Sequence, residues 1–466
     1  MEERDVVVIG GGPAGYAAAI RAAQLGGRVA LVEKDKLGGT CLNRGCIPTS
    51  VFARAVEFLE MGAQSKDYGI LFKEQSIDFS KLAARKDVVV KTLIGGVGML
   101  LREHGVEMEQ GSAAFLLPGE VSLTLTSGEK KVIKARNVVV ATGGRCRQLP
   151  IPGGGMVLDA GAALESKEAP ISVILLGAGF IGMALATIFS KLGAYVAVVE
   201  KSEFMLPGID REIVALYEKE ARKGKIAYYP RCTVRAIEEG PDGQRRVRAE
   251  ADGQEIVLDA QLVFNTEERE ANIGELGLDR FGLKLNGKGG IAVDGAMKTS
   301  VPGVFAAGDA TMEHMWTEAA YMEGVVAAEN AMGGQSRINY SAMPYWTCTI
   351  PRVAGVGLTE EEAVKKDYET KVARYFLAAN GMAVAIGQRT GMLKLITERK
   401  YGQILGVHMV GAQATELIGE ASLAVRLELT CRDVGDAMHV HPSVSEALWE
   451  AARSIGGDSI HLIPGR

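Results

Sequence analysis

Two closely spaced cysteines near the start of the chain stand in surroundings suited to chemistry. Cys41 and Cys46 enclose Leu42-Asn43-Arg44-Gly45 and follow Gly38-Gly39. In a reducing compartment, a close cysteine pair is more often catalytic or metal-binding than structural. A structural zinc site would need two further Cys or His ligands at short spacing, and none lies nearby in the sequence. We therefore predict a catalytic role for the pair and no metal site.

A repeated pattern of elements supplies the framework around this pair. The first copy is an apolar strand at 5–9, Gly10-x-Gly12-x-x-Gly15, a helix at 16–25, a strand at 28–32 and Glu33. The second copy is a strand at 171–176, Gly177-x-Gly179-x-x-Gly182, a helix at 183–192, a strand at 195–199 and Glu200. In both copies the acid follows the third glycine by 18 residues (33 − 15 and 200 − 182).

Each residue type in this pattern has a physical role in binding a dinucleotide. The first glycine permits a tight turn, and the second lets the backbone approach a pyrophosphate at a helix N-terminus. The third lets the helix lie close to the strand, and the acid binds a ribose hydroxyl. One glycine pattern alone could be an ordinary tight turn, but two copies in register predict two dinucleotide-binding folds.

Outside the repeat, two apolar strands end in small and polar residues. One is Val138-Val139-Val140-Ala141-Thr142-Gly143, and the other is Val304-Phe305-Ala306-Ala307-Gly308-Asp309, whose short acid could accept hydrogen bonds from a sugar-like chain. From about Tyr345 the pattern changes to strands and two helices, at 360–366 and 413–427, without another nucleotide motif. This part predicts a third domain.

Composition excludes several classes of protein. The 466 residues include 52 Lys and Arg against 57 Asp and Glu, a net charge of −5, which argues against a nucleic-acid-binding surface. No apolar run approaches the ~18 residues of a membrane span. The N-terminal residues lead directly into Val6-Val7-Val8-Ile9, with no basic region ahead of a cleavable apolar stretch. We expect a cytoplasmic protein with no nucleic-acid or membrane partner.

Together these motifs resemble the flavoprotein disulfide reductases, and within them the dihydrolipoyl dehydrogenases. The resemblance covers essentially the whole chain. It rests on the two glycine motifs, Gly38-Gly39-Thr40-Cys41-Leu42-Asn43-Arg44-Gly45-Cys46-Ile47-Pro48, Ala141-Thr142-Gly143, Gly308-Asp309, Gly406-Val407-His408, Glu416-Leu417-Ile418-Gly419-Glu420 and His439-Val440-His441-Pro442-Ser443-Val444-Ser445-Glu446.

The resemblance implies an α/β fold: two Rossmann-like dinucleotide-binding domains, for FAD and NAD, and a C-terminal α+β dimerisation domain. We place the FAD-binding domain at 1–147 and 273–342, the NAD-binding domain at 148–272 and the interface domain at 343–466. The FAD residues would be Gly10, Gly12, Gly15, Glu33, Thr40, Thr142, Gly143, Gly308 and Asp309. The NAD residues would be Gly177, Gly179, Gly182 and Glu200, and an acid at 200 favours NAD over its 2′-phosphorylated form.

The resemblance also implies the catalytic roles. Cys41 would be the interchange thiol that meets the substrate, and Cys46 would lie against the flavin. His441, oriented by Glu446, would be the base that deprotonates the incoming dithiol, in the active site of the other subunit. The expected partners are therefore a lipoyl-bearing protein or a small dithiol, and a second copy of the chain in a homodimer with shared sites.

The local sequence is compatible with this chemistry. Thiol–disulfide exchange requires a thiolate, and Pro48 favours a helix start next to Cys46, where the helix dipole lowers a thiol pKa. The two sulfurs could bond only if the helix start is distorted, which Gly45 would allow.

The sequence departs from the family pattern at three places. The family usually carries a Lys in the helix after the second cysteine, paired with a Glu after the third glycine of the NAD motif; here these positions are Ser50 and Ala184. Because both partners of the ion pair are absent together, neither leaves an unpaired buried charge, and the loss of one compensates the loss of the other. In addition, Glu267-Glu268 stand where a glycine and an arginine are usual. These two acids could form a solvated turn, or they could weaken NAD binding through repulsion.

Three functions are consistent with the sequence. The first is FAD-dependent oxidation of dihydrolipoyl groups by NAD through a Cys41–Cys46 disulfide. The second is a disulfide reductase of the same fold with another substrate. The third is a flavoprotein redox or assembly subunit with impaired NAD turnover. The presence of His441 and Glu446 argues against the third, because a scaffold has no need of a base.

Overall fold

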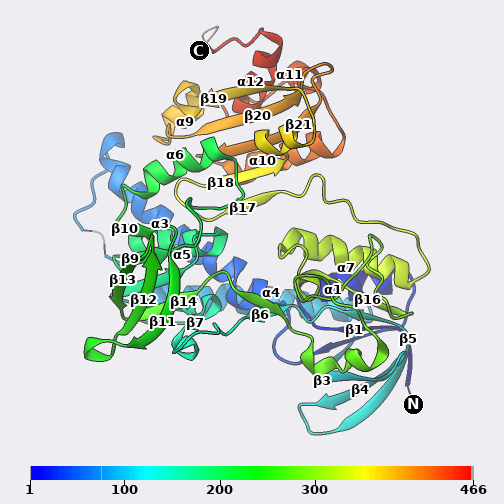
Figure 1. Cartoon of the computed structure of the whole chain (residues 1–466). Helices are drawn as coiled ribbons and strands as arrows, with labels where there is room; N and C mark the ends of the chain where they lie inside the picture. The colour runs from blue at the N-terminus through cyan, green and yellow to red at the C-terminus, as the bar shows by residue number, and fades with distance from the viewer. Residues whose placement is uncertain (1, 75, 463–466) are drawn as a thin grey trace.

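The computed structural model describes residues 2–74 and 76–462, which leaves the ends of the first and last predicted domains, residues 1 and 463–466, outside the described residues. Figure 1 shows two α/β units in the lower half of the view and a third, built on an antiparallel sheet, above them. The predicted fold class, with two dinucleotide-binding folds and a C-terminal α+β domain, is confirmed.

The first unit is built on a six-stranded sheet whose parallel part has the order β16-β5-β1-β2-β3. Its strands are β1 (Glu2–Ile9), β2 (Val29–Glu33), β3 (Glu107–Leu117), β4 (Glu120–Leu125), β5 (Lys130–Val140) and β16 (Val304–Ala306). Its helices are α1 (Pro13–Gln24), α2 (Gly39–Arg44), α3 (Cys46–Gln64), α4 (Phe79–Glu103) and α7 (Thr317–Ala331). Because β16 comes late in the chain, the first sheet is completed only after the second unit.

The second unit is a five-stranded parallel sheet of order β10-β9-β8-β14-β7. Its strands are β7 (Leu158–Asp159), β8 (Ser172–Leu176), β9 (Tyr195–Val199), β10 (Ile226–Tyr229) and β14 (Leu262–Asn265), with helices α5 (Phe180–Lys191) and α6 (Arg211–Ala221). Between β10 and β14 the chain forms an antiparallel three-stranded sheet of β11 (Thr233–Glu239), β12 (Arg245–Ala251) and β13 (Gln254–Ala260). Two short strands, β6 (Gly144–Cys146) and β15 (Arg269–Ala271), pair antiparallel where the chain passes between the units.

The third unit is a five-stranded antiparallel sheet of order β17-β18-β21-β20-β19. Its elements are β17 (Tyr345–Thr347), β18 (Val353–Gly357), β19 (Thr370–Phe376), β20 (Met392–Glu398), β21 (Ile404–Val410), α8 (Glu360–Lys365), α9 (Gly381–Ala385), α10 (Ala414–Arg426), α11 (Cys431–Asp436) and α12 (Glu446–Gly456). Single 3₁₀ turns elsewhere are Ser65–Tyr68, Gly154–Met156, Ala160–Leu164, Pro241–Gly243, Gly274–Leu276, Leu278–Phe281, Gly308–Thr311 and Leu377–Ala379.

Two sequence predictions about helices were wrong in detail. The helices after the glycine motifs begin earlier than predicted, because Gly12 and Gly179 are the N-caps and the third glycine lies in the first helical turn. In the third unit the predicted helices α8 and α10 are present, but α9, α11 and α12 were missed. The first two are too short to show a helical period. The third buries Ala447, Leu448 and Ala451 against the sheet, a face that its apolar spacing could have indicated.

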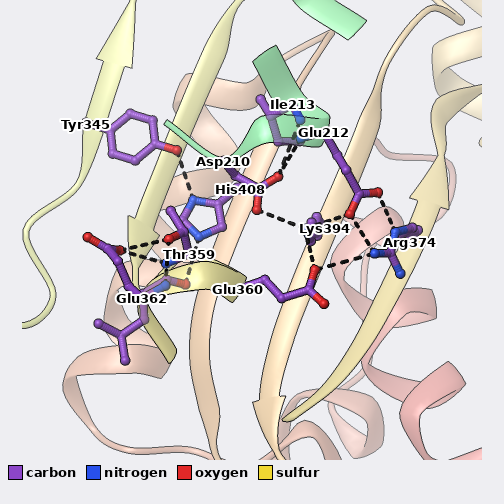
Figure 2. A network of polar contacts seen from close by, with 11 residues as sticks. Asp210, Glu212, Ile213, Tyr345, Thr359, Glu360, Glu362, Arg374, Lys394 and His408 are labelled. Atoms are coloured by element: carbon purple, nitrogen blue, oxygen red, sulfur yellow. Dashed lines mark hydrogen bonds and ion pairs between the residues drawn. The ribbon is translucent and has the colours of Figure 1, made fainter. Parts of the chain in front are cut away.

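A buried lysine joins the second unit to the third (Figure 2). Lys394 on β20 is 3% exposed, and its Nζ lies 2.9 Å from Asp210 Oδ2, 2.7 Å from Glu212 Oε1 and 2.7 Å from Glu360 Oε2. Arg374 on β19 binds both carboxylate oxygens of Glu212. Asp210 also caps α6 by accepting hydrogen bonds from its backbone N–H groups. These contacts fix the start of α6, and with it the second unit, against the third sheet.

The strands that carry the glycine turns are apolar and buried in the part that leads into each turn. Val6, Val7 and Val8 on β1 and Ile174 and Leu175 on β8 are at most 1% exposed. Such strands are typical of parallel sheets covered on both faces. In the described part of the chain, no helix is both long and apolar enough to span a membrane.

Candidate active site

The cysteine pair lies at a break between two helices. Cys41 is within α2, Cys46 is the first residue of α3, and Gly45 separates them with φ −123° and ψ −110°. The helix start is therefore interrupted at Gly45, as predicted. Both sulfurs are free thiols, and Cys46 Sγ lies 3.4 Å from Thr317 Oγ1 at the start of α7.

The two thiols have opposite electrostatic environments. Hydrogen bonding with Cys41, opposed by burial and assisted by Thr317, lowers the pKa of the Cys46 thiol to about 7. The same hydrogen bond, together with burial, raises the pKa of Cys41. The proton of the pair therefore stays on Cys41, and Cys46 is the thiolate near neutral pH.

The first glycine turn has the geometry that its motif predicts. Gly10 has φ +106°, and a methyl group at Gly15 would lie 1.8 Å from Gly10 O, so the helix packs against the turn without room for a side chain. Glu33, at the end of β2, accepts hydrogen bonds from the backbone N–H of Gly11 (2.6 Å) and of Asp35 (2.7 Å). Its side chain is half-buried and so remains accessible.

A large cavity of ≈ 790 Å³ joins this turn to the cysteine pair. The predicted residues that line it are Gly10, Gly12, Glu33, Thr40, Cys41, Cys46, Thr142, Gly143, Gly308 and Asp309. Gly15 lies behind the turn and does not line the cavity. The strand end at 141–143, the Gly308 turn and the cysteine pair are therefore brought to one space, although they are far apart in the sequence.

Two polar groups on the cavity wall are left without partners. Thr142 Oγ1 and Arg269 Nε are buried and have no hydrogen-bond partner within the described ranges. Arg269 Nη2 lies 3.0 Å from Asp309 Oδ2, and burial raises the pKa of Asp309 while Arg269 opposes the rise. Unpaired buried polar groups are costly, so these two atoms fit a polar ligand. Sequence reasoning missed Arg269, because only the pairing of β15 with β6 brings it to Asp309.

The second glycine turn repeats the first in its backbone. Gly177 has φ +114°, and a methyl group at Gly182 would lie 2.0 Å from Gly177 O. Glu200 accepts hydrogen bonds from the backbone N–H of Ala178 and of Ser202, each at 2.6 Å. Unlike Glu33, Glu200 is only 3% exposed.

Glu267 lies beside Glu200, on the second glycine turn. A methyl group at Gly177 would lie 2.1 Å from Glu267 Cγ and 2.5 Å from its Cδ, so this side chain packs directly on the turn. Burial, followed by the carboxylate of Glu200, raises the pKa of Glu267 to about 7. Its neighbour Glu268 instead binds Lys201, 2.8 Å away. Glu267 therefore does not lie in a solvated turn, whereas Glu268 forms a partly exposed ion pair.

The two family positions that differ near the cysteines are unequal in burial. Ala184 on α5 is 5% exposed and lines the cavity, whereas Ser50 on α3 is exposed. Helices α3 and α5 contact each other. A charge at position 184 would therefore be buried, and one at position 50 would not.

His441 and Glu446 form a hydrogen-bonded pair on the surface of the third unit. His441 Nδ1 lies 2.9 Å from Glu446 Oε1, and the histidine side chain is 76% exposed. Neither residue lines the cavity of its own chain. The neighbouring His439 is different: its side chain is 7% exposed and held by Glu420 at 2.9 Å. His441 is thus the accessible histidine of the two.

Almost the whole chain is similar to proteins of one known family. Residues 4–331 match the family described as pyridine nucleotide-disulphide oxidoreductase, and residues 343–452 match the dimerisation domain of that family. A dihydrolipoyl dehydrogenase of Geobacillus stearothermophilus is 36% identical over 99% of this chain and 98% of its own. The enzyme of the same name from Thermus scotoductus is 38% identical over 99% and 100%, and a mitochondrial one from Arabidopsis thaliana is 34% identical over 99% and 92%. The chain therefore belongs to the pyridine nucleotide-disulphide oxidoreductase family.

Proposed function

We propose that the chain is an FAD- and NAD-dependent dihydrolipoyl dehydrogenase that oxidises the dithiol of a dihydrolipoyl group. One observation carries this proposal: the free thiols of Cys41 and Cys46 line the same cavity as the first glycine turn. The names of relatives that align with 99% of the chain support the substrate class.

The residues of the cavity fit FAD. The cavity residues that would hold it are Gly10, Gly12, Glu33, Thr40, Thr142, Gly143, Gly308, Asp309 and, in addition to the sequence prediction, Arg269. Gly15, behind the turn, would let the helix pack close to it. The unpaired Thr142 hydroxyl and Arg269 Nε would gain partners there. Bound FAD supplies a two-electron carrier between the cysteine pair and NAD. Gly177, Gly179, Gly182 and Glu200 would hold NAD.

The cysteines exchange bonds with the substrate. A thiolate of the dihydrolipoyl group attacks Cys41 Sγ of the oxidised pair, and Cys46 leaves as a thiolate. The second substrate thiol then displaces Cys41, which takes up a proton, so the substrate becomes a disulfide and the pair a dithiol. The low pKa of Cys46 makes it the better leaving group, and the high pKa of Cys41 keeps the final proton there.

His441 acts as the base for the substrate thiols, and Glu446 orients its ring through Nδ1. Because His441 is exposed and lies outside the cavity of its own chain, it serves the cysteine pair of a second copy in a homodimer. The dimerisation domain at 343–452 supports this arrangement. The partners are this second copy and a lipoyl-bearing protein or small dithiol.

The domain limits belong to the same proposal: 1–147 with 273–342 for FAD, 148–272 for NAD and 343–466 for dimerisation. The cytoplasmic location stays a prediction.

A second candidate, a flavoprotein with impaired NAD turnover, is favoured by one observation. Glu267 packs on Gly177, where NAD would bind. Anaerobic titration tests both candidates: dihydrolipoamide and NADH are added separately to the purified yellow protein, and flavin absorbance is followed. The first candidate expects reduction by both reagents and the second by dithiol alone. A colourless protein, or one that dihydrolipoamide does not reduce, would overturn the proposed function.

A further inference from the structure

The side chain of Glu267 takes a place that a dinucleotide needs. Its Cγ and Cδ lie over Gly177, and its Oε1 would be 3.8 Å from a methyl group at Gly179. In this type of fold the pyrophosphate lies against the glycine turn and the helix N-terminus, and the ribose lies on the acid. Glu267 therefore covers the turn, and the neighbouring Glu200 is only 3% exposed.

The internal repeat shows that this arrangement is not required by the fold. The backbone N–H of Ala141 binds Ile9 O in the first unit, and that of Thr266 binds Leu176 O in the second. By this register Glu267 occupies the position of Thr142. The first turn has a short hydroxyl residue there and opens into the cavity, whereas the second has a longer acid that lies on the glycine.

The charged groups around Glu267 leave it paired with Glu200. Lys201, next to Glu200 at the end of β9, lies 2.8 Å from Glu268 Oε1, so its charge is already matched. Tyr228 faces the site from β10, and burial raises the pKa of its hydroxyl, which stays neutral. Burial and Glu200 raise the pKa of Glu267 to about 7. Below neutral pH, Glu267 therefore holds a proton beside the carboxylate of Glu200.

We propose that Glu267 is a gate on the second dinucleotide site: NAD binds only when the side chain of Glu267 turns away from Gly177. This inference rests on the proposed function, because it takes NAD as the ligand. It adds a residue that sets both the affinity for NAD and the dependence of that affinity on pH.

The direction of the pH effect follows from the two positions of Glu267. In the closed position its pKa is about 7, and in water it returns to the ordinary range near ~4.3. Between these values, opening the gate releases one proton, so nucleotide affinity rises by up to about tenfold per pH unit. Above neutral pH the closed form has already lost the proton, and the affinity levels off.

Calorimetric titration of the FAD-loaded protein with ADP-ribose measures this release. ADP-ribose carries the pyrophosphate of NAD without the nicotinamide, so no electron transfer complicates binding. Titrations in buffers of different ionisation enthalpy give the number of protons released. We expect about one proton at about pH 6 and almost none at about pH 8.5, with an affinity about five- to tenfold higher at about pH 7 than at about pH 6.

Three variants separate the gate from a general charge effect. Glu267→Thr copies the residue of the first unit; it should bind ADP-ribose about tenfold more tightly than wild type at about pH 6, without proton release. Glu267→Gln keeps the length of the side chain, so it should abolish proton release without tightening binding as much. Glu268→Gln removes the same charge one residue away and should keep the proton release, with less than about a twofold change in affinity.

The gate is overturned if wild-type affinity is independent of pH in this range, or if Glu267→Thr binds no more tightly than wild type. Reduction of the flavin by dihydrolipoamide is measured on the same preparations. If reduction proceeds and all variants bind ADP-ribose equally, the gate fails and the proposed function stands. If dihydrolipoamide does not reduce the flavin, the proposed function fails, whatever the calorimetry shows.

Discussion

The two glycine turns of this chain have nearly the same backbone, but the strand end beside each turn differs. Gly10 and Gly177 have φ values of +106° and +114°. In each unit the acid at the end of the second strand, Glu33 or Glu200, accepts hydrogen bonds from two backbone N–H groups. Beside the first turn stands Ala141-Thr142-Gly143, and beside the second stands Thr266-Glu267-Glu268. The first turn opens into a cavity, and the second is covered.

This difference teaches that a dinucleotide motif specifies the backbone of the binding turn but not whether a dinucleotide can reach it. The turn, the helix start and the acid are close in sequence. Access depends on a strand end that comes from another part of the chain: residues 141–143 for the first turn and 266–268 for the second. The four predictions below test how far the two units differ, from the largest expected effect to the smallest.

The comparison assigns all thiol chemistry to the first unit. Cys46→Ser should lower dithiol oxidation by about 10³-fold or more, because the leaving thiolate is lost. Cys46→Ser should also abolish the long-wavelength charge-transfer band between the Cys46 thiolate and the oxidised flavin. Cys41→Ser should show that band even without substrate. Absorbance spectra and steady-state assays check this. Two variants with indistinguishable spectra would contradict the assignment of roles.

The proposed base, His441, lies in the third unit and not in either dinucleotide unit. His441→Gln should lower dithiol-driven turnover by about 10²-fold, the effect expected for losing a general base, with FAD content unchanged. When the His441→Gln and Cys41→Ser variants are mixed and exchange subunits, part of the activity should return. One of the two active sites in the mixed dimer then has both an intact cysteine pair and His441. His439→Gln is the matched control and should lose less activity. Absence of rescue after verified exchange would place the base in its own chain.

A glutamate at the strand end of the first unit should cover its glycine turn, as Glu267 covers the second. Thr142→Glu places a carboxylate at the position of Glu267, beside Gly10, and its burial should weaken FAD binding by about 2 kcal/mol, or about 30-fold. Thr142→Val keeps the shape and loses only the hydroxyl, so it should cost about fivefold. The ratio of flavin to protein absorbance after dilution measures retention. If Thr142→Glu retains FAD like wild type, the strand end does not control access.

The smallest effect concerns the contact between the two units. Ser50→Lys with Ala184→Glu should speed flavin reduction by NADH by about threefold to tenfold, because an ion pair is restored beside the flavin. Alone, Ala184→Glu should lower the melting temperature, since position 184 is 5% exposed. Ser50→Lys alone should be tolerated, because its position is exposed. Stopped-flow traces and thermal melts check these outcomes, and equal effects of the two single changes would contradict the burial argument.

Most of the fold followed from local sequence. The two glycine motifs predicted both parallel units, and the Gly45 break between the cysteines was predicted from one residue. The helices α9 and α11 were missed because five or six residues do not reveal a period. The starts of α1 and α5 were misplaced because the third glycine is an interior helix residue, whose absent side chain permits contact with the strand.

The sequence by itself determined the two turns, the acids that follow them and the pairing of the cysteines with the first turn, because these features depend on residues close together in the chain. Tertiary structure alone decided that Arg269 binds Asp309, that Thr317 lies against Cys46, that His441 is exposed and that Glu267 lies on Gly177. The three contacts join segments that are distant in the sequence, and the exposure of His441 depends on how the third unit packs around it. A one-dimensional pattern carries spacing along the chain, and it carries no information about which strand end will cover a turn.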